Sequence, residues 1–108
     1  MCTVFLSYPM NGKTEKEMKE IRDEMIKMLP EGLNWIDNSD CKGEETDGRL
    51  HYLGEAIKKM DKADMVMFHR DWQRARGCHI EMEVARAYNI PIIDIPGESY
   101  YRKPPVNY

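Results

Sequence analysis

The apolar residues of this chain fall into two patterns that alternate from the N-terminus onward. Short, nearly continuous apolar runs, rich in β-branched or aromatic residues and typical of buried strands, lie at 3–8, 33–36, 64–68 and 90–95. Apolar residues at steps of three and four, typical of amphipathic helices, lie at 14–29, 47–62 and 77–88. Thr14 stands three residues before Glu17, which is the spacing of a capping box and predicts the start of the first helix.

This order of strands and helices is typical of a parallel α/β sheet with right-handed crossovers. We predict one domain over 1–108, a three-layer sandwich with a four- to five-stranded parallel sheet of the flavodoxin or Rossmann-like kind. Ligands of such sheets bind beyond the carboxyl ends of the strands. The segments expected at that edge are 8–14, 37–48 and 70–81.

Composition narrows the classes of protein. Of the 108 residues, 42% are hydrophobic and 32% charged, as in a small globular domain. A formal net charge of -3 argues against a nucleic-acid surface, and the apolar runs are too short to span a membrane. The first residues show no signal-peptide pattern, and three cysteines without metal-type spacing favour reduced thiols. We therefore expect a cytoplasmic protein with no metal, no cofactor, and neither nucleic acid nor membrane as partner.

Glu81 is the first candidate for chemistry. It is expected in the first turn of the third helix, four residues after Gly77, where the helix dipole would keep its carboxylate anionic. A fixed anionic carboxylate at the ligand edge can attack an electron-poor carbon such as C1′ of a sugar. The competing explanation is the ordinary preference of glutamate for helix starts.

Other residues at this edge have both a functional and a purely structural interpretation. Tyr8 can direct its hydroxyl to the edge or simply end the first strand. The turn at 11–14 can bind an anion through N–H groups and Lys13, or it is only a capped turn. Trp72 either stacks on a base or shields the end of the sheet. Cys78, at a helix start, has either a lowered pKa or a place in the core.

Together these segments resemble the nucleoside 2-deoxyribosyltransferase superfamily, and in particular its short members of the DUF4406 type. The resemblance covers most of 2–95. It rests on Phe-Leu-Ser-Tyr-Pro with the Asn-Gly-Lys-Thr turn, on Ala-Asp-Met-Val, and on Gly-Cys-His-Ile-Glu followed by Ile-Pro-Ile-Ile. It implies that Glu81 is the nucleophile and that Tyr8 assists it. It also implies a homodimer or higher homo-oligomer, since active sites of the family are completed by a neighbouring subunit.

The chain departs from the family pattern at two acidic positions. Ala56 stands at one of them, with Glu55 beside it, and Ala75 stands at the other, with Asp71 earlier in the same loop. The candidate catalytic residues are therefore Glu81, Tyr8 and Asp71. The candidate substrate-binding residues are Ser7, Asn11, Gly12, Lys13, Thr14, Glu55, Trp72 and Gly77.

The resemblance implies cleavage of the N-glycosidic bond of a nucleoside or nucleoside 5′-monophosphate, by hydrolysis or deoxyribosyl transfer. We expect Lys13 to bind the phosphate, with Arg74 or Arg76 as the alternative. Two other functions stay open: a catalytically inactive protein that binds or sequesters a nucleotide, and a small interaction module. A second resemblance, to TIR domains that cleave NAD, rests on Phe-Leu-Ser-Tyr and on the cysteine three residues before Glu81.

Overall fold

The computed structural model describes residues 2–39 and 48–93 of the chain. Its elements, in chain order, are β1 Thr3–Ser7, α1 Glu15–Lys27, β2 Asn34–Ile36, α2 Arg49–Met60, β3 Met65–Phe68, the 3₁₀ turn η1 Trp72–Arg74, α3 Arg76–Ala87 and β4 Ile92–Ile93. The predicted alternation of strands and helices is confirmed. The predictions for 40–47 and for the end of the last strand lie outside the described residues.

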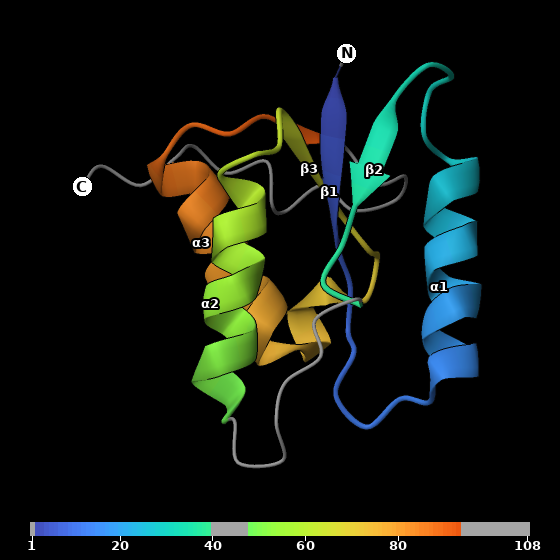
Figure 1. Cartoon of the computed structure of the whole chain (residues 1–108), viewed down its shortest axis with the longest axis vertical. Coiled ribbons are helices and arrows are strands. Elements are labelled where there is room, and N and C mark those ends of the chain that lie inside the picture. The colour runs from blue at the N-terminus through green and yellow to red at the C-terminus, as the bar shows by residue number, and fades with distance from the viewer. Residues whose placement is uncertain (1, 40–47, 94–108) are drawn as a thin grey trace.

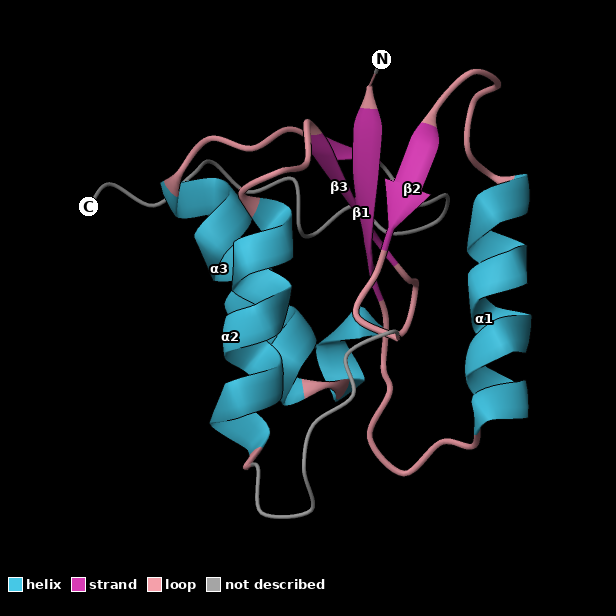
Figure 2. Ribbon diagram, viewed as in Figure 1, coloured by secondary structure: helices cyan, strands magenta, loops and turns pink. Residues whose placement is uncertain are grey.

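The described strands form one parallel sheet in the order β2-β1-β3-β4. Helix α1 covers one face of this sheet, and α2 and α3 cover the other (Figure 1, Figure 2). The predicted three-layer α/β sandwich is thus confirmed, with a four-stranded sheet in the described part of the chain. None of the described helices is long and apolar enough to cross a membrane.

Strand β1 is buried on both faces, which explains its continuous apolar sequence. Phe5 packs into the core beneath α2 and α3, whereas Leu6 packs with Met25 of α1. Side chains alternate along a strand, so Ser7 follows Phe5 to the α3 face and Tyr8 follows Leu6 to the α1 face. Two consecutive residues of the sequence therefore serve opposite faces of the sheet.

The strand order creates a switch point between β1 and β3. From β1 the chain crosses over α1 to β2, and from β3 it crosses over α3 to β4 on the other side. The two connections diverge, which leaves a crevice beyond the carboxyl ends of β1 and β3. Ser7 and Phe68 end these strands as register partners. A ligand site is expected beyond this pair.

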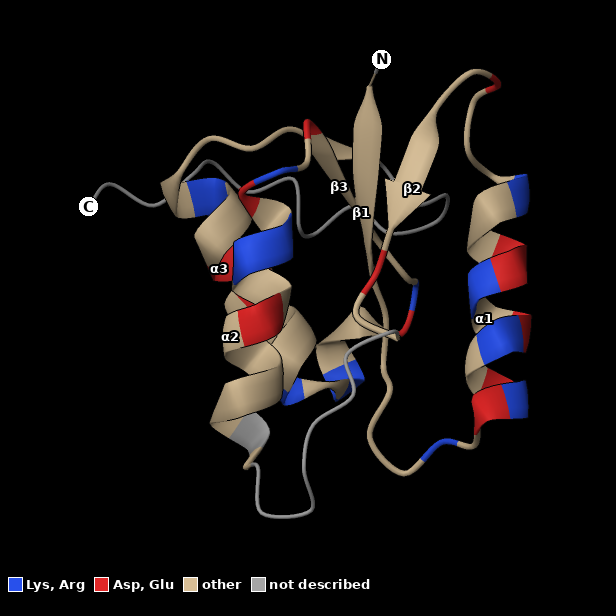
Figure 3. Cartoon of the chain, in the orientation of Figure 1, with Lys and Arg blue, Asp and Glu red and all other residues tan. Residues whose placement is uncertain are grey.

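Charged residues of both signs run along α1 (Figure 3). Lys19 and Asp23, one turn apart, form an exposed ion pair at 2.9 Å. This matches the solvent-facing side expected of an amphipathic helix.

The capping box that starts α1 gives a first testable prediction. Thr14 Oγ1 accepts the Glu17 N–H at 3.1 Å, and a Glu17 carboxylate oxygen accepts the Thr14 N–H at 3.1 Å. Thr14→Ala removes one of these partners, so we expect the free energy of unfolding to fall by about 1 kcal/mol. Urea denaturation measures this, with Lys16→Ala, exposed in the same turn, as control. Equal midpoints for the two variants would contradict a stabilising cap.

Candidate functional site

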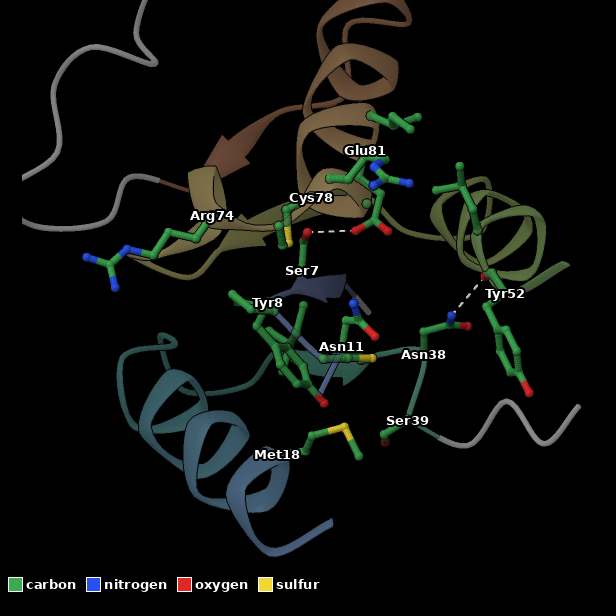
Figure 4. Close-up of a pocket in the computed structure, with 18 of the residues that line it drawn as sticks. Ser7, Tyr8, Asn11, Met18, Asn38, Ser39, Tyr52, Arg74, Cys78 and Glu81 are labelled. Carbon is green, nitrogen blue, oxygen red and sulfur yellow. Dashed lines mark hydrogen bonds between the residues drawn. The ribbon is translucent and has the colours of Figure 1, made fainter. Parts of the chain in front are cut away.

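A pocket of about 730 Å³ opens at the carboxyl end of β1, between the segments that follow β1, β2 and β3. Each of the three segments predicted for this edge contributes to its lining, and α1 and α2 add further side chains (Figure 4). Apolar residues make up much of the wall: Phe5, Leu6, Met10, Met18, Leu50, Leu53 and Ile80. The volume is that of a pocket for a small organic ligand.

The central polar contact of this pocket joins β1 to α3. Ser7 Oγ donates a hydrogen bond of 2.6 Å to Glu81 Oε1, and both side chains are buried (Figure 4). Glu81 Oε2 accepts no hydrogen bond from the described residues. A Cβ atom at Gly77 would lie 4.0 Å from Oε2, in ordinary van der Waals contact, so Gly77 and this oxygen are close neighbours in the pocket wall. One carboxylate oxygen is therefore held and the other is left unpaired in a residue that lines the pocket.

Burial sets the charge of Glu81. With 8% of its surface exposed, desolvation raises the pKa of the carboxyl to about 7, and the Ser7 hydrogen bond opposes this rise. The expectation of a first-turn carboxylate kept anionic by the dipole is wrong. Helix α3 begins at Arg76, so Glu81 lies in its second turn, where the dipole has weakened and desolvation dominates. Near neutral pH this group both loses and regains its proton.

Tyr8 lines the same pocket but has a different partner. Its hydroxyl donates a hydrogen bond of 2.6 Å to Asp37 Oδ2 rather than contacting Glu81. Burial and this carboxylate together raise the pKa of the Tyr8 hydroxyl. Ser39 donates to the other Asp37 oxygen from its backbone N–H at 3.1 Å and from its hydroxyl at 2.7 Å. Tyr8 therefore helps to position the segment after β2.

Three further predicted residues, Asn11, Gly12 and Gly77, line the pocket with Ser7 and Glu81. Lys13 and Thr14 are not among its lining residues, and Thr14 uses its side chain in the capping box. The N–H groups of 13 and 14 are also bonded within the turn and the cap. The start of α1 is thus less open to an anion than the sequence suggests.

The remaining predicted residues lie outside the pocket lining. Glu55 forms an ion pair with Lys58 at 3.1 Å on α2. The Asp71 N–H is bound by the His69 ring at 3.1 Å beyond β3. Trp72 is buried in the core against the Phe68 and His79 rings, so of its two readings the structure favours the shield at the end of the sheet.

Cys78 belongs to the core on the α3 face. Burial raises the pKa of its thiol to about 12, so the suggestion of a lowered pKa is wrong and the core reading is confirmed. Within the described residues, no group of three His, Cys, Asp or Glu side chains is arranged to hold a metal ion.

Several lining residues have no signature in the sequence. Asn38 donates from its amide to the Tyr52 carbonyl at 2.9 Å and so joins the end of β2 to α2 across the pocket (Figure 4). Asp37 does not itself line the pocket but binds Tyr8, which does; it was also missed, although a polar residue directly after a strand at the ligand edge is a usable signal. Arg74 and Arg76, predicted from the sequence as the alternative phosphate ligands, also line the pocket, at the end of η1 and the start of α3.

One family model matches residues 2–94, and its description is Domain of unknown function (DUF4406). The chain belongs to the DUF4406 family. No curated protein and no solved structure matches it. All the described residues that line the pocket lie within the part matched by the DUF4406 model.

Proposed function

We propose that this DUF4406 protein cleaves the N-glycosidic bond of a nucleoside or nucleoside 5′-monophosphate, with Glu81 as the nucleophile. The observation that carries the proposal is the buried Ser7–Glu81 pair at the switch point of the sheet. A carboxyl group whose pKa is strongly raised, in a cleft at the ligand edge, is typical of an active site. The resemblance to the nucleoside 2-deoxyribosyltransferases supports the same residue.

The reaction follows from the two oxygens of Glu81. In the ionised form, Oε2 attacks C1′ of the sugar while Oε1 stays bonded to Ser7. The bond from C1′ to the base nitrogen breaks, its electron pair leaves with the base, and the base takes a proton from water. A water molecule or a second base then attacks C1′ and releases the Glu81 carboxylate, which gives hydrolysis or transfer.

The environment of Glu81 suits this role. Burial removes the water that would otherwise stabilise the carboxylate, so the anion is more reactive than an exposed one. A pKa of about 7 leaves about half of the molecules ionised at neutral pH. The enzyme therefore has a reactive anion without a permanently charged group in its core.

One observation favours binding without turnover as the second candidate. Among the described residues that line the pocket, Glu81 is the single carboxylate, and Ala75 stands where the resemblance would place a further acid. Glycosidases commonly use two carboxyl groups, of which the second protonates the leaving group. A pocket with one carboxylate is suited to bases that leave without such help, or to a nucleotide that is held intact.

A panel of nucleosides and their 5′-monophosphates, incubated with the protein between pH 5 and pH 9, tests the proposal. Chromatography should show free base, with release increasing as Glu81 ionises around pH 7. Binding by calorimetry without base release across the panel would establish the second candidate instead. If the protein neither binds a member of the panel nor releases base, both candidate functions are refuted.

We expect 5′-monophosphates to bind more tightly than the nucleosides, and we assign the phosphate to Arg76. Arg76 lines the pocket at the start of α3, whereas Lys13 does not line it and the Arg74 guanidinium points away from the Ser7–Glu81 pair (Figure 4). Arg76→Ala should reduce the preference for the monophosphate by about 1–3 kcal/mol in calorimetry. Lys13→Ala is the matched control and should leave the preference in place. The opposite pattern would move the phosphate to the start of α1, and equal affinities would exclude a phosphate site.

The homo-oligomer and the cytoplasmic location stay predictions. Leu50 lines the pocket with 80% of its surface exposed, so a second copy packed over it would bury an apolar side chain and also narrow the pocket.

A further inference from the structure

Ser7 is the most completely enclosed polar residue of the pocket. Only 1% of its surface is exposed, and its carbonyl accepts the His69 N–H at 2.9 Å. As the last residue of β1 it is also held in register against Phe68 of β3. Because the sheet fixes the Ser7 backbone, it also fixes the point from which the hydroxyl extends. The Ser7 hydroxyl donates to Glu81.

The direction of the hydrogen bonds at Ser7 follows from counting protons. A serine hydroxyl carries one proton, and an ionised carboxylate can only accept, so Ser7 donates to Glu81. Cys78, near the start of α3, also lines the pocket. Because burial raises the pKa of its thiol to about 12, Cys78 stays protonated at neutral pH and does not compete as an anion for the Ser7 proton. The Ser7 proton is therefore directed to Glu81 Oε1 (Figure 4).

We infer that Ser7 is the positioning residue that makes Oε2 the attacking oxygen of Glu81. Its hydrogen bond occupies Oε1 and fixes the carboxylate plane, so Oε2 is the oxygen left to meet the substrate. The inference rests on the proposed function. The length of 2.6 Å is typical of a hydroxyl donating to a charged carboxylate, which such a bond stabilises. Ser7 therefore sets both the orientation and the ionisation of the nucleophile.

The effect of Ser7 on the Glu81 pKa can be separated from the effects of the neighbouring groups. Among the described residues that line the pocket, the other titratable or charged groups come from the segment after β1, from α2, from η1 and from α3: Tyr8, Tyr52, Arg74, Arg76 and Cys78. Tyr8 already donates to Asp37. Burial and the Ser7 bond are the two causes that act on the Glu81 pKa, in opposite directions. Removing the Ser7 hydroxyl therefore leaves burial unopposed.

The test compares Ser7→Ala and Ser7→Thr with the wild-type protein. In Ser7→Ala the acid limb of the profile of kcat against pH should move upward by about one pH unit. Base release at pH 7 should fall by at least about five-fold. Release at pH 9 should regain the part lost through ionisation but stay below wild type, because the carboxylate plane is no longer fixed, with KM little changed. Ser7→Thr keeps the hydroxyl and should restore the wild-type profile. A packing role alone would lower activity at every pH without moving the limb.

A second readout does not depend on activity. Titration of the ¹³C carboxyl signal of Glu81 by NMR, assigned by its loss in Glu81→Gln, reports the midpoint directly. Ser7→Ala should raise this midpoint by about one unit, and Ser7→Cys, a weaker donor, by less. Ser7→Cys also replaces Ser7→Ala if that variant does not fold. Ser39→Ala is the matched control, because it removes a hydroxyl bonded to a different carboxylate, Asp37, and should leave the Glu81 midpoint in place.

The pH profile and the NMR titration together distinguish a failure of the Ser7 inference from a failure of the proposed glycosidic cleavage. An unchanged Glu81 midpoint in Ser7→Ala overturns the role of Ser7, whether or not base is released. A raised midpoint in a protein that releases no base supports the control of Glu81 by Ser7 and refutes glycosidic cleavage. A raised midpoint with the shifted acid limb supports both.

Discussion

Glu81→Gln is expected to abolish base release and, above pH 7, to make the protein more stable than wild type. The amide cannot act as the nucleophile, so the loss of activity should be complete within detection. It keeps the shape of the carboxyl and can still accept the Ser7 hydrogen bond. The same substitution removes a charge that is nearly excluded from water. Activity and stability should therefore change in opposite directions.

The gain in stability has a defined dependence on pH. The folded state raises the Glu81 pKa from 4.5 to about 7, so between these values the folded chain binds more protons than the unfolded chain. The free energy of unfolding therefore falls as pH rises through this window and stays low above it. At 1.4 kcal/mol for each pKa unit, the cost of the charge is on the order of 3 kcal/mol. Glu81→Gln should match wild type near pH 4 and exceed it by up to this amount at pH 8.

Urea denaturation across this pH range, with base release measured in parallel, checks the prediction. Glu83→Gln is the matched control, since Glu83 is exposed on the same helix and pairs with Arg86 at 3.5 Å. It should change stability by less than about 0.5 kcal/mol and leave base release intact. Full activity of Glu81→Gln would remove Glu81 from the reaction. A stability difference independent of pH would show that Glu81 is not a buried ionising group.

The fold could be predicted because burial imposes patterns on this chain. A parallel strand covered on both faces needs an unbroken apolar run, as in β1, and a helix covered on one face needs apolar residues every third or fourth position, as in α1. Thr14 and Glu17 specify the helix start by local hydrogen bonds alone. Each of these signals depends only on residues that are close in the sequence, so each can be recognised from the sequence alone.

The site could be predicted only in part, because its geometry depends on distant residues. Glu81 is predicted from its place near the start of a helix. Its burial depends on the packing of α3 on the sheet, which raises its pKa to about 7, so it is not the permanently anionic group that the sequence predicts. The alternation of β1 shows that Ser7 and Tyr8 face opposite sides. Which side meets α3 follows only from the fold, and so Ser7 rather than Tyr8 contacts Glu81.

Asp37→Ala is expected to be the most destabilising change at the rim of the pocket. Asp37 is buried after β2 and accepts hydrogen bonds from Tyr8 and from two groups of Ser39, while the Arg22 guanidinium lies 3.7 Å away. Its removal leaves the buried Tyr8 hydroxyl without its acceptor and Arg22 without its counter-charge. We expect the free energy of unfolding to fall by about 3 kcal/mol, measured by urea denaturation.

The cause of this loss can be tested by pairing Asp37→Ala with Tyr8→Phe. Tyr8→Phe alone should cost about 1–2 kcal/mol and lower base release only modestly, because the hydroxyl serves Asp37 rather than Glu81. In the double variant the two costs should not add, since the bond they share is lost once. Asp23→Ala, which breaks an exposed ion pair on α1, should cost less than about 1 kcal/mol. Additive costs would show that the Tyr8–Asp37 bond contributes nothing, and that other contacts hold the segment after β2 against the pocket.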